Sequence, residues 1–288
     1  MRDTILFGDC RETLKEFDEK ARMCVTSPPY YGLRYYGCEE SQIGLEQTPE
    51  EFIDELVKVF REVKNVLTDD GTCWVNIGDS YYNYRPGRGQ GLAKQTVSNT
   101  KQDLPDVCPR RGNRIRGLKE KDLIGIPWMF AFAMRADGWY LRQDIIWNKP
   151  NPMPESVRDR CTKSHEYIFL FSKNQNYYFD VDSIKEPTRR KRSVWNVTKK
   201  PYKGAHFAVY PPELIEPCIR AGSEKGDIVL DPFMGSGTTA MVAKSLGRDY
   251  NGCELHEDYG NLIQKRVGEY HPVEEVSQED TINILDIV

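Results

Sequence analysis

The stretch Ile228-Val-Leu-Asp231-Pro-Phe-Met-Gly235-Ser-Gly237-Thr-Thr-Ala240 decides the fold of this chain. Its three leading apolar residues predict a short buried strand, and the run after the glycines, ending near Gly247, predicts a helix. Gly235, Gly237 and Ala240 fit the pattern G-x-G-x-x-A, in which glycines permit a tight turn and close approach of a ligand to the backbone. The sequence therefore predicts a strand–loop–helix unit at a nucleoside-cofactor site, with a plain structural turn as the alternative.

An acidic residue further along the chain supports the cofactor site. Glu254 closes the next strand candidate, Tyr250 to Cys253, where a carboxylate can accept hydrogen bonds from both hydroxyls of a ribose. The pattern alone fits a dinucleotide as well as S-adenosylmethionine. A nucleoside triphosphatase is disfavoured, because the lysine that a phosphate-binding loop needs before Thr238 is absent.

Helix and strand signals alternate through most of the 288 residues. Thr48-Pro-Glu-Glu51 is a capping box that starts a helix, and we expect Asp70-Gly71 to end it. Further elements are expected as a helix at Lys121 to Arg135 and strands at Cys73 to Ile77, Tyr140 to Trp147 and Tyr167 to Phe171. The alternation predicts an α/β fold rather than an all-α or all-β fold, in one domain over residues 1–272.

Positive charge is concentrated in two segments. Residues 85–119 hold nine Lys and Arg against two Asp, and residues 185–203 hold eight against one Glu, so each segment carries +7. Because the whole chain carries −4, the remainder carries −18. An acidic body with two basic insertions, at about 84–117 and 173–204, fits contact with a polyanion, and two solvated loops are the alternative. Residues 273–288 form a separate acidic tail.

The composition argues against several classes of protein. No run of about 18 apolar residues predicts a membrane span, and the N-terminal stretch lacks the apolar core of a signal peptide. The eight cysteines form no CxxC pair. We therefore expect free thiols in a reducing, cytoplasmic compartment, with no membrane and no metal site.

A second motif, Thr26-Ser27-Pro28-Pro29-Tyr30, directly follows the apolar Met23-Cys24-Val25. Consecutive prolines end a strand sharply, because proline lacks the ladder N–H and restricts the residue before it. The turn presents carbonyl and hydroxyl acceptors that suit an amino group, and a ring that can stack on a flat base. A proline turn that only ends a strand is the alternative.

Taken together, TSPPY and DPFMGSGTT resemble the paired catalytic and cofactor motifs of the amino-methylating DNA methyltransferases. The catalytic motif comes first, which is similar to the permuted β-class order of that family. Other stretches resemble its remaining motifs: Leu6 to Cys10, Asn76 to Asp79, Trp147 to Asn151 with Thr162, His165 and Glu166, and His206 to Leu214. The resemblance covers about 270 residues. It implies a Rossmann-like α/β fold, with a mostly parallel sheet flanked by helices, that uses S-adenosylmethionine.

The resemblance also assigns roles to residues. Gly235 and Gly237 would approach the methionine portion of S-adenosylmethionine, Glu254 would hold its ribose and Asp9 its adenine edge. The other cofactor contacts that it implies are Asp231, Phe233, Thr238, His206 and Pro211. In the catalytic motif Ser27-Pro28-Pro29-Tyr30, the serine hydroxyl and the first proline's carbonyl would accept the amino hydrogens of a base swung out of the duplex, and the tyrosine would stack on it.

The implied reaction is methyl transfer to an exocyclic amine, with neither a metal nor a covalent enzyme intermediate. In the resembling family, serine before Pro-Pro-Tyr is commoner in cytosine-N4 enzymes, whereas aspartate or asparagine is typical of adenine-N6 enzymes. Ser27 therefore favours cytosine N4, with adenine N6 as the alternative.

The resemblance makes double-stranded DNA the expected partner, and it is compatible with a homodimer and a cognate restriction endonuclease. We expect phosphate contacts from Arg189, Arg190, Lys191 and Arg192, with Arg158 and Arg160 as secondary candidates near the active-site rim. Two other classes stay open at this point. A nicotinamide-dependent oxidoreductase would leave TSPPY unexplained, and a DNA-binding protein without turnover would make the intact motifs superfluous.

Overall fold

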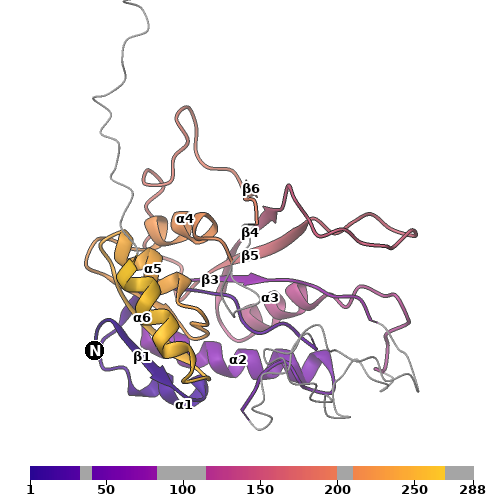
Figure 1. Ribbon diagram of the computed structural model, residues 1–288, viewed down its shortest axis with the longest axis horizontal. Coiled ribbons are helices and arrows are strands. Elements are labelled where there is room, and N and C mark those ends of the chain that lie inside the picture. Colours follow the sequence, from indigo (N-terminus) through magenta and orange to yellow (C-terminus); the bar gives the residue numbers. More distant parts are fainter. Residues whose placement is uncertain (33–40, 83–114, 200–209, 270–288) are drawn as a thin grey trace, which may run out of the picture.

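The computed structural model describes residues 1–32, 41–82, 115–199 and 210–269. These residues form an eight-stranded sheet in the order β1-β8-β7-β2-β3-β5-β4-β6 (Figure 1). The strands are β1 (Thr4–Phe7), β2 (Ala21–Thr26), β3 (Leu67–Ile77), β4 (Tyr140–Asn148), β5 (His165–Ser172), β6 (Val194–Asn196), β7 (Ile228–Asp231) and β8 (Asp249–Glu254). Most of the basic insertion expected at 84–117, and the whole tail at 273–288, lie outside the described residues.

The sheet is mostly parallel, as predicted. Neighbouring strands from β1 through β8, β7 and β2 to β3 are all parallel, and β6 adds to β4 in parallel. β5 runs antiparallel between β3 and β4. The carboxyl ends of the other seven strands therefore share one edge of the sheet with the amino end of β5.

Helices cover both faces of the sheet (Figure 1). One face carries α1 (Cys10–Thr13), the 3-10 helix η1 (Leu14–Glu16), α2 (Pro49–Val66) and α3 (Ile126–Ala136), and the other carries α4 (Pro212–Gly222), α5 (Thr238–Ser245) and α6 (Tyr259–Glu269). Side chains alternate between the faces of a strand, so Cys24 packs with the α2 layer while Met23 and Val25 pack with the α4 layer. Two apolar cores hold the three layers together.

The capping box of α2 is confirmed, but the end of this helix was predicted wrongly. Thr48 and Glu51 exchange side-chain and backbone hydrogen bonds at 3.1 and 3.2 Å. The helix ends at Val66 and the strand β3 begins at once. The Asp70-Gly71 pair lies inside β3, where the register against β2 shifts. A Cβ on Gly71 would lie 2.9 Å from the Thr68 carbonyl oxygen, so this glycine permits an irregular strand rather than ending a helix.

The helix expected at Lys121 to Arg135 starts later, at Ile126. Gly125 has a left-handed φ of 88° and a proline follows Ile126, which fits the first turn of a helix. The carboxylate of Asp79 accepts the N–H groups of Gly125 at 3.1 Å and Ile126 at 3.2 Å, so it caps the helix from a distant segment. Residues before Gly125 instead form turns and a bridge from Leu123 to Tyr81.

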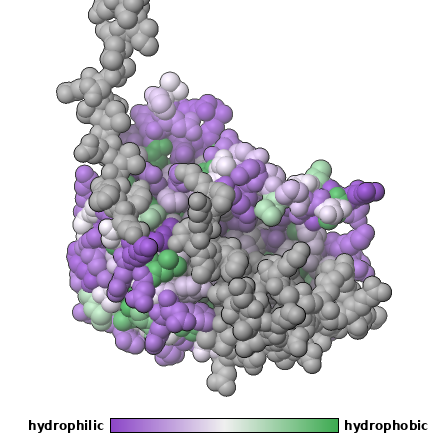
Figure 2. Space-filling view, in the orientation of Figure 1, coloured by the Kyte–Doolittle hydropathy of each residue, from purple (hydrophilic) through white to green (hydrophobic). Residues whose placement is uncertain are grey.

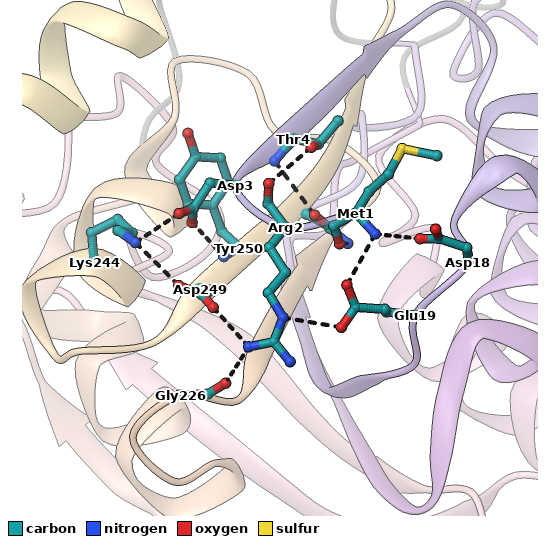
Figure 3. Close-up of polar contacts among 11 residues, drawn as sticks. Met1, Arg2, Asp3, Thr4, Asp18, Glu19, Gly226, Lys244, Asp249 and Tyr250 are labelled. Carbon is teal, nitrogen blue, oxygen red and sulfur yellow. Dashed lines mark hydrogen bonds and ion pairs between the residues drawn. The ribbon is translucent and has the colours of Figure 1, made fainter.

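Ion pairs hold the edge strand β1 against β8 (Figure 3). Arg2 contacts Asp249 at 2.9 Å and Glu19 at 3.0 Å, while Lys244 of α5 contacts Asp3 at 2.7 Å and Asp249 at 3.1 Å. Exposed ion pairs contribute little individually, typically under about 1 kcal/mol, so this network sets the position of β1 more than it stabilises the fold.

The surface shown in Figure 2 is mainly hydrophilic, with scattered apolar residues. Among the described residues, no helix is both long enough and apolar enough to cross a membrane.

Candidate active site

The two sequence motifs meet at the edge where the parallel strands end. β2 leads into Ser27 and lies beside β7, which leads into the loop after Asp231; Cys24 pairs with Leu230. β8 and β1 follow, and the end of β1 lies against Glu254. Ligands of open α/β sheets bind outside the carboxyl ends of the strands, so this edge is the candidate active site.

Asp231 joins the two motifs from within the core. Only 1% of this residue is exposed, and its carboxylate accepts the hydroxyls of Thr26 at 2.6 Å and Thr239 at 2.5 Å. The Tyr210 hydroxyl adds a contact at 3.1 Å, and the Phe233 N–H another at 3.0 Å. Burial raises the pKa of Asp231, and these donors oppose the rise without cancelling it. Asp231 therefore holds the starts of both motifs together from below the candidate site.

Glu254 and the glycine loop (residues 232–237) contact each other beside Asp231. The Glu254 carboxylate accepts the N–H groups of Gly235 at 2.8 Å and His256 at 3.0 Å. Gly235 and Gly237 have φ of 54° and 79°, a region that favours glycine, and a Cβ on Gly237 would lie 2.7 Å from the Ile263 side chain. Burial raises the pKa of Glu254 to about 7, against the effect of its N–H donors. A carboxylate has about four acceptor positions, so Glu254 can still accept the hydroxyls of a ribose.

Asp9 follows β1 and lies next to Glu254. Its neighbour Gly8 donates its N–H to the Glu254 carbonyl at 2.9 Å. The Asp9 carboxylate accepts the backbone N–H of Arg11 at 2.9 Å and pairs with its guanidinium at 2.5 Å, and Arg11 also pairs with Glu55 at 2.5 Å. Burial opposes ionisation, but these contacts with Arg11 hold the pKa of Asp9 below its usual range. Asp9 is thus an ionised acceptor held in place by Arg11.

The proline motif turns away from the end of β2. Pro28 is buried, whereas Ser27, Pro29 and Tyr30 are partly exposed at the edge of the sheet. The Tyr30 hydroxyl donates to the Glu166 carboxylate at 2.7 Å. The tyrosine of the motif is therefore hydrogen-bonded to β5, the strand on the other side of β3 from β2.

The remaining predicted cofactor contacts occupy different environments. Phe233 is partly exposed in the glycine loop, and Pro211 is buried at the start of α4. Thr238 is buried, and its hydroxyl accepts a hydrogen bond from Arg266 at 3.1 Å. His206 lies outside the described residues.

The predicted DNA contacts fall into two groups. Arg158 and Arg160 lie in the connection between β4 and β5, and Arg189 to Arg192 precede the outermost strand β6. In Figure 1, the loop between β5 and β6, drawn in salmon, projects away from the sheet. Trp195 anchors this segment, since it is only 5% exposed and packs in the α4 layer.

Several of these basic groups already have partners within the chain. Arg160 pairs with Glu155 at 2.6 Å and its guanidinium lies 3.8 Å from the centre of the Tyr81 ring. Arg189 pairs with Glu186 at 2.5 Å. By contrast, Arg158, Arg190 and Arg192 are exposed, and the ammonium of Lys191 lies 5.0 Å from the centre of the Trp195 ring.

The residues whose hydrogen bonds hold Asp231 and the glycine loop in place were not identified from the sequence. Thr239 and Tyr210 donate to Asp231, and Arg266 of α6 holds the glycine loop through the Ser236 carbonyl at 3.1 Å. Lys149, which pairs with Glu166, was matched to a family motif but given no role. No local pattern marks Arg266, because its contact depends on how α6 docks.

Within the described part of the chain, no three His, Cys, Asp or Glu side chains are grouped to hold a metal ion. The six cysteines that it includes are free thiols, and five of them are buried.

The architecture is similar to that of solved structures described as DNA methyltransferases or putative DNA modification methylases. The PvuII DNA methyltransferase, described as cytosine-N4-specific, gives a TM-score of 0.67 at 20% identity, covering 91% of this chain and 85% of its own. TTHA0409 of Thermus thermophilus, solved with S-adenosyl-L-methionine, gives 0.61 at 26% identity and covers 91% of each chain. The protein is thus an S-adenosylmethionine-dependent methyltransferase.

Sequence comparison narrows this class. The family model for DNA methylase matches residues 21–265, and the chain belongs to this family of amino-methylating enzymes. It is 50% identical over 280 residues to the Type II methyltransferase M.XycI of Xanthomonas campestris pv. cyanopsidis, covering 93% of this chain and 88% of that one. It is 49% identical over 276 residues to M.SmaI of Serratia marcescens, covering 91% and 90%. The oxidoreductase alternative is therefore wrong.

Proposed function

We propose that this enzyme methylates the exocyclic N4 amine of cytosine in double-stranded DNA. The observation that carries the base assignment is Ser27, a partly exposed residue between the buried Thr26 and Pro28, beside the glycine loop. In the amino-methylating family that the motifs resemble, serine at this position is commoner in cytosine-N4 enzymes.

The catalytic motif supplies acceptors for an amine and a platform for a base. An exocyclic amine is a poor nucleophile, because its lone pair is delocalised into the ring. The Ser27 hydroxyl and the Pro28 carbonyl accept the two amino hydrogens, which favours a pyramidal nitrogen and stabilises the positive charge that develops on it. Tyr30 stacks on the base after it leaves the duplex, and so orients the amine.

The residues that face the catalytic motif across the site hold the cofactor. Glu254 accepts the ribose hydroxyls, Asp9 accepts from the adenine edge, and Gly235 and Gly237 leave room for the methionine portion. When bound, S-adenosylmethionine supplies an electrophilic methyl group on a sulfonium. The ionised state of Asp9 and the left-handed glycines of the loop support these roles.

The test is nucleoside mass spectrometry of unmethylated genomic DNA incubated with the protein and S-adenosylmethionine. We expect N4-methylcytosine. N6-methyladenine would overturn the base assignment and keep the family, and no methylated nucleoside would overturn the proposal. Tyr30→Ala is the matched control, because it should abolish the product while S-adenosylhomocysteine still binds.

A further inference from the structure

Four strands bring a polar cluster together beside Tyr30. Tyr30 follows β2, Asn76 lies in β3, Lys149 follows β4, and Glu166 is the second residue of β5. Only 7% of the Lys149 side chain and 14% of the Glu166 side chain are exposed. The cluster therefore lies behind the partly exposed tyrosine, at the edge of the sheet where the catalytic motif is found.

Glu166 is the acceptor at the centre of this cluster. It accepts the Tyr30 hydroxyl at 2.7 Å and the Asn76 amide at 3.4 Å, and it pairs directly with the Lys149 ammonium. Burial opposes ionisation, but the charge and hydrogen bond of Lys149 hold the pKa of Glu166 below its usual range. The bond from Tyr30 therefore ends on an ionised oxygen, which makes it stronger than a bond between neutral groups.

The ring of Tyr30 is also restrained from the side. A Cβ on Gly78 would lie 2.8 Å from Cε2 of Tyr30 and 3.3 Å from the Glu166 carboxyl carbon. The ring thus lies against the bare backbone of Gly78 while its hydroxyl is tied at the far end. Two restraints of this kind define the plane of the ring.

We infer that Glu166 is a positioning residue for methylation, which accepts the Tyr30 hydroxyl and so fixes the ring plane on which the target base stacks. Lys149 and Asn76 hold the carboxylate in place. The inference rests on the proposed function, because it needs Tyr30 as the stacking platform.

A purely structural role makes different predictions. Buried ion pairs are a weak source of net stability, because desolvation offsets their attraction, and removal of one partner destabilises the fold. A structural role would lower stability and leave the turnover of the folded fraction unchanged. A positioning role lowers kcat through Tyr30, and the two residues then act as one unit.

The experiment is a double-variant cycle with Tyr30→Phe, Glu166→Gln and both together. We measure kcat and KM from the methylated nucleoside formed on unmethylated genomic DNA. Each single variant should lose about 10- to 100-fold in kcat, because small errors of position have such effects, while S-adenosylhomocysteine binds within about twofold of the parent. Both changes remove the same contact. The kcat of the double variant should therefore be no more than about twofold below the kcat of the less active single variant.

Two matched controls remove a hydroxyl and a charge elsewhere. Tyr31→Phe deletes the hydroxyl that contacts the Gln47 carbonyl at 3.2 Å, and Glu216→Gln neutralises a carboxylate paired with Arg220 at 2.9 Å. Both should keep the kcat of the parent. Independent losses that multiply in the double variant, or an unchanged kcat in Glu166→Gln, would overturn the inference.

A second readout does not depend on activity. This readout is the fluorine NMR spectrum of protein labelled with 3-fluorotyrosine. The resonance of Tyr30 is assigned as the one that is lost in Tyr30→Phe. It should shift or broaden in Glu166→Gln and stay unchanged in Glu216→Gln. An unaltered resonance overturns the positioning role, whereas failure of the proposed function shows itself as the absence of N4-methylcytosine with the unaltered protein.

Discussion

The hydroxyl of Thr26 donates to the carboxylate of Asp231 at 2.6 Å, across 205 positions of sequence. Each is the last residue of its strand, and the two strands are parallel neighbours. Thr26 leads into the proline motif, and Asp231 leads into the glycine loop. One buried hydrogen bond therefore sets the spacing between the two halves of the candidate active site.

Loss of this bond should weaken both the fold and the reaction. Thr26→Val keeps the shape of the side chain and removes the donor, so we expect the free energy of unfolding to fall by about 1–2 kcal/mol, measured by urea denaturation. Methylation should fall as well. Thr4→Val is the control, because the Thr4 hydroxyl contacts the Arg2 carbonyl at an exposed site. Equal stabilities of the two variants would contradict the prediction.

Glu254 should make stability and cofactor binding respond to pH in opposite directions. Its folded-state pKa of about 7 lies above its ordinary value of 4.5, so the protonated acid stabilises the free protein below about pH 4.5, and that contribution is lost as the pH rises through 7. In the proposed role, the ionised form of Glu254 accepts the ribose hydroxyls, so we expect affinity for S-adenosylhomocysteine to rise over the same range.

Glu254→Gln separates these two effects, since glutamine stays neutral. At pH 8 the variant should bind S-adenosylhomocysteine at least about tenfold more weakly than the parent, as expected for a lost charged acceptor. Between pH 5 and pH 8 the melting temperature of the free parent should fall more than that of the variant, because only the parent has a carboxyl group that ionises over this range. Melting temperatures that change equally with pH in the two proteins would contradict the prediction.

Gly237 should be constrained by sterics as well as by conformation. Gly237→Ala places a Cβ 2.7 Å from Ile263 in a left-handed turn, whereas Gly226→Ala, with φ of 85°, meets nothing within 4 Å. Both variants should lose about 1 kcal/mol from the backbone, and only Gly237→Ala should lose more and bind S-adenosylhomocysteine poorly. Calorimetric titration and thermal unfolding measure both quantities, and similar losses in the two variants would count against the prediction.

The segment before β6 should contribute to the salt dependence of DNA binding. With Arg189, Arg190, Lys191 and Arg192 all changed to Gln, the slope of log affinity against log salt should fall by up to about 3.6, or about 0.9 for each phosphate contact. Arg189 is paired with Glu186, so its share should be the smallest. A control with Lys58→Gln and Arg61→Gln on α2 should keep the slope, and an equal slope in all three proteins would exclude these contacts.

The sequence predicted the elements whose signals are local. The glycine loop, the proline turn and the capping box of α2 each depend on a few neighbouring residues, and all three are where they were expected. The start of α3 was missed because its cap, Asp79, is 46 positions away from Gly125. Arg266 and the pair of Lys149 with Glu166 were missed as functional groups for the same reason, since only tertiary docking brings them to the motifs.

The pairing of β1 with β8 has a consequence for the timing of folding. Thr4 lies opposite Asn251, so the edge that carries Asp9 can dock only after β8 has left the ribosome. Closing a loop of this length is slow compared with forming neighbouring contacts. The two sides of the candidate cofactor site therefore come together only after β8 has been synthesised, and we expect a nascent chain that stops before Glu254 to be unable to modify DNA.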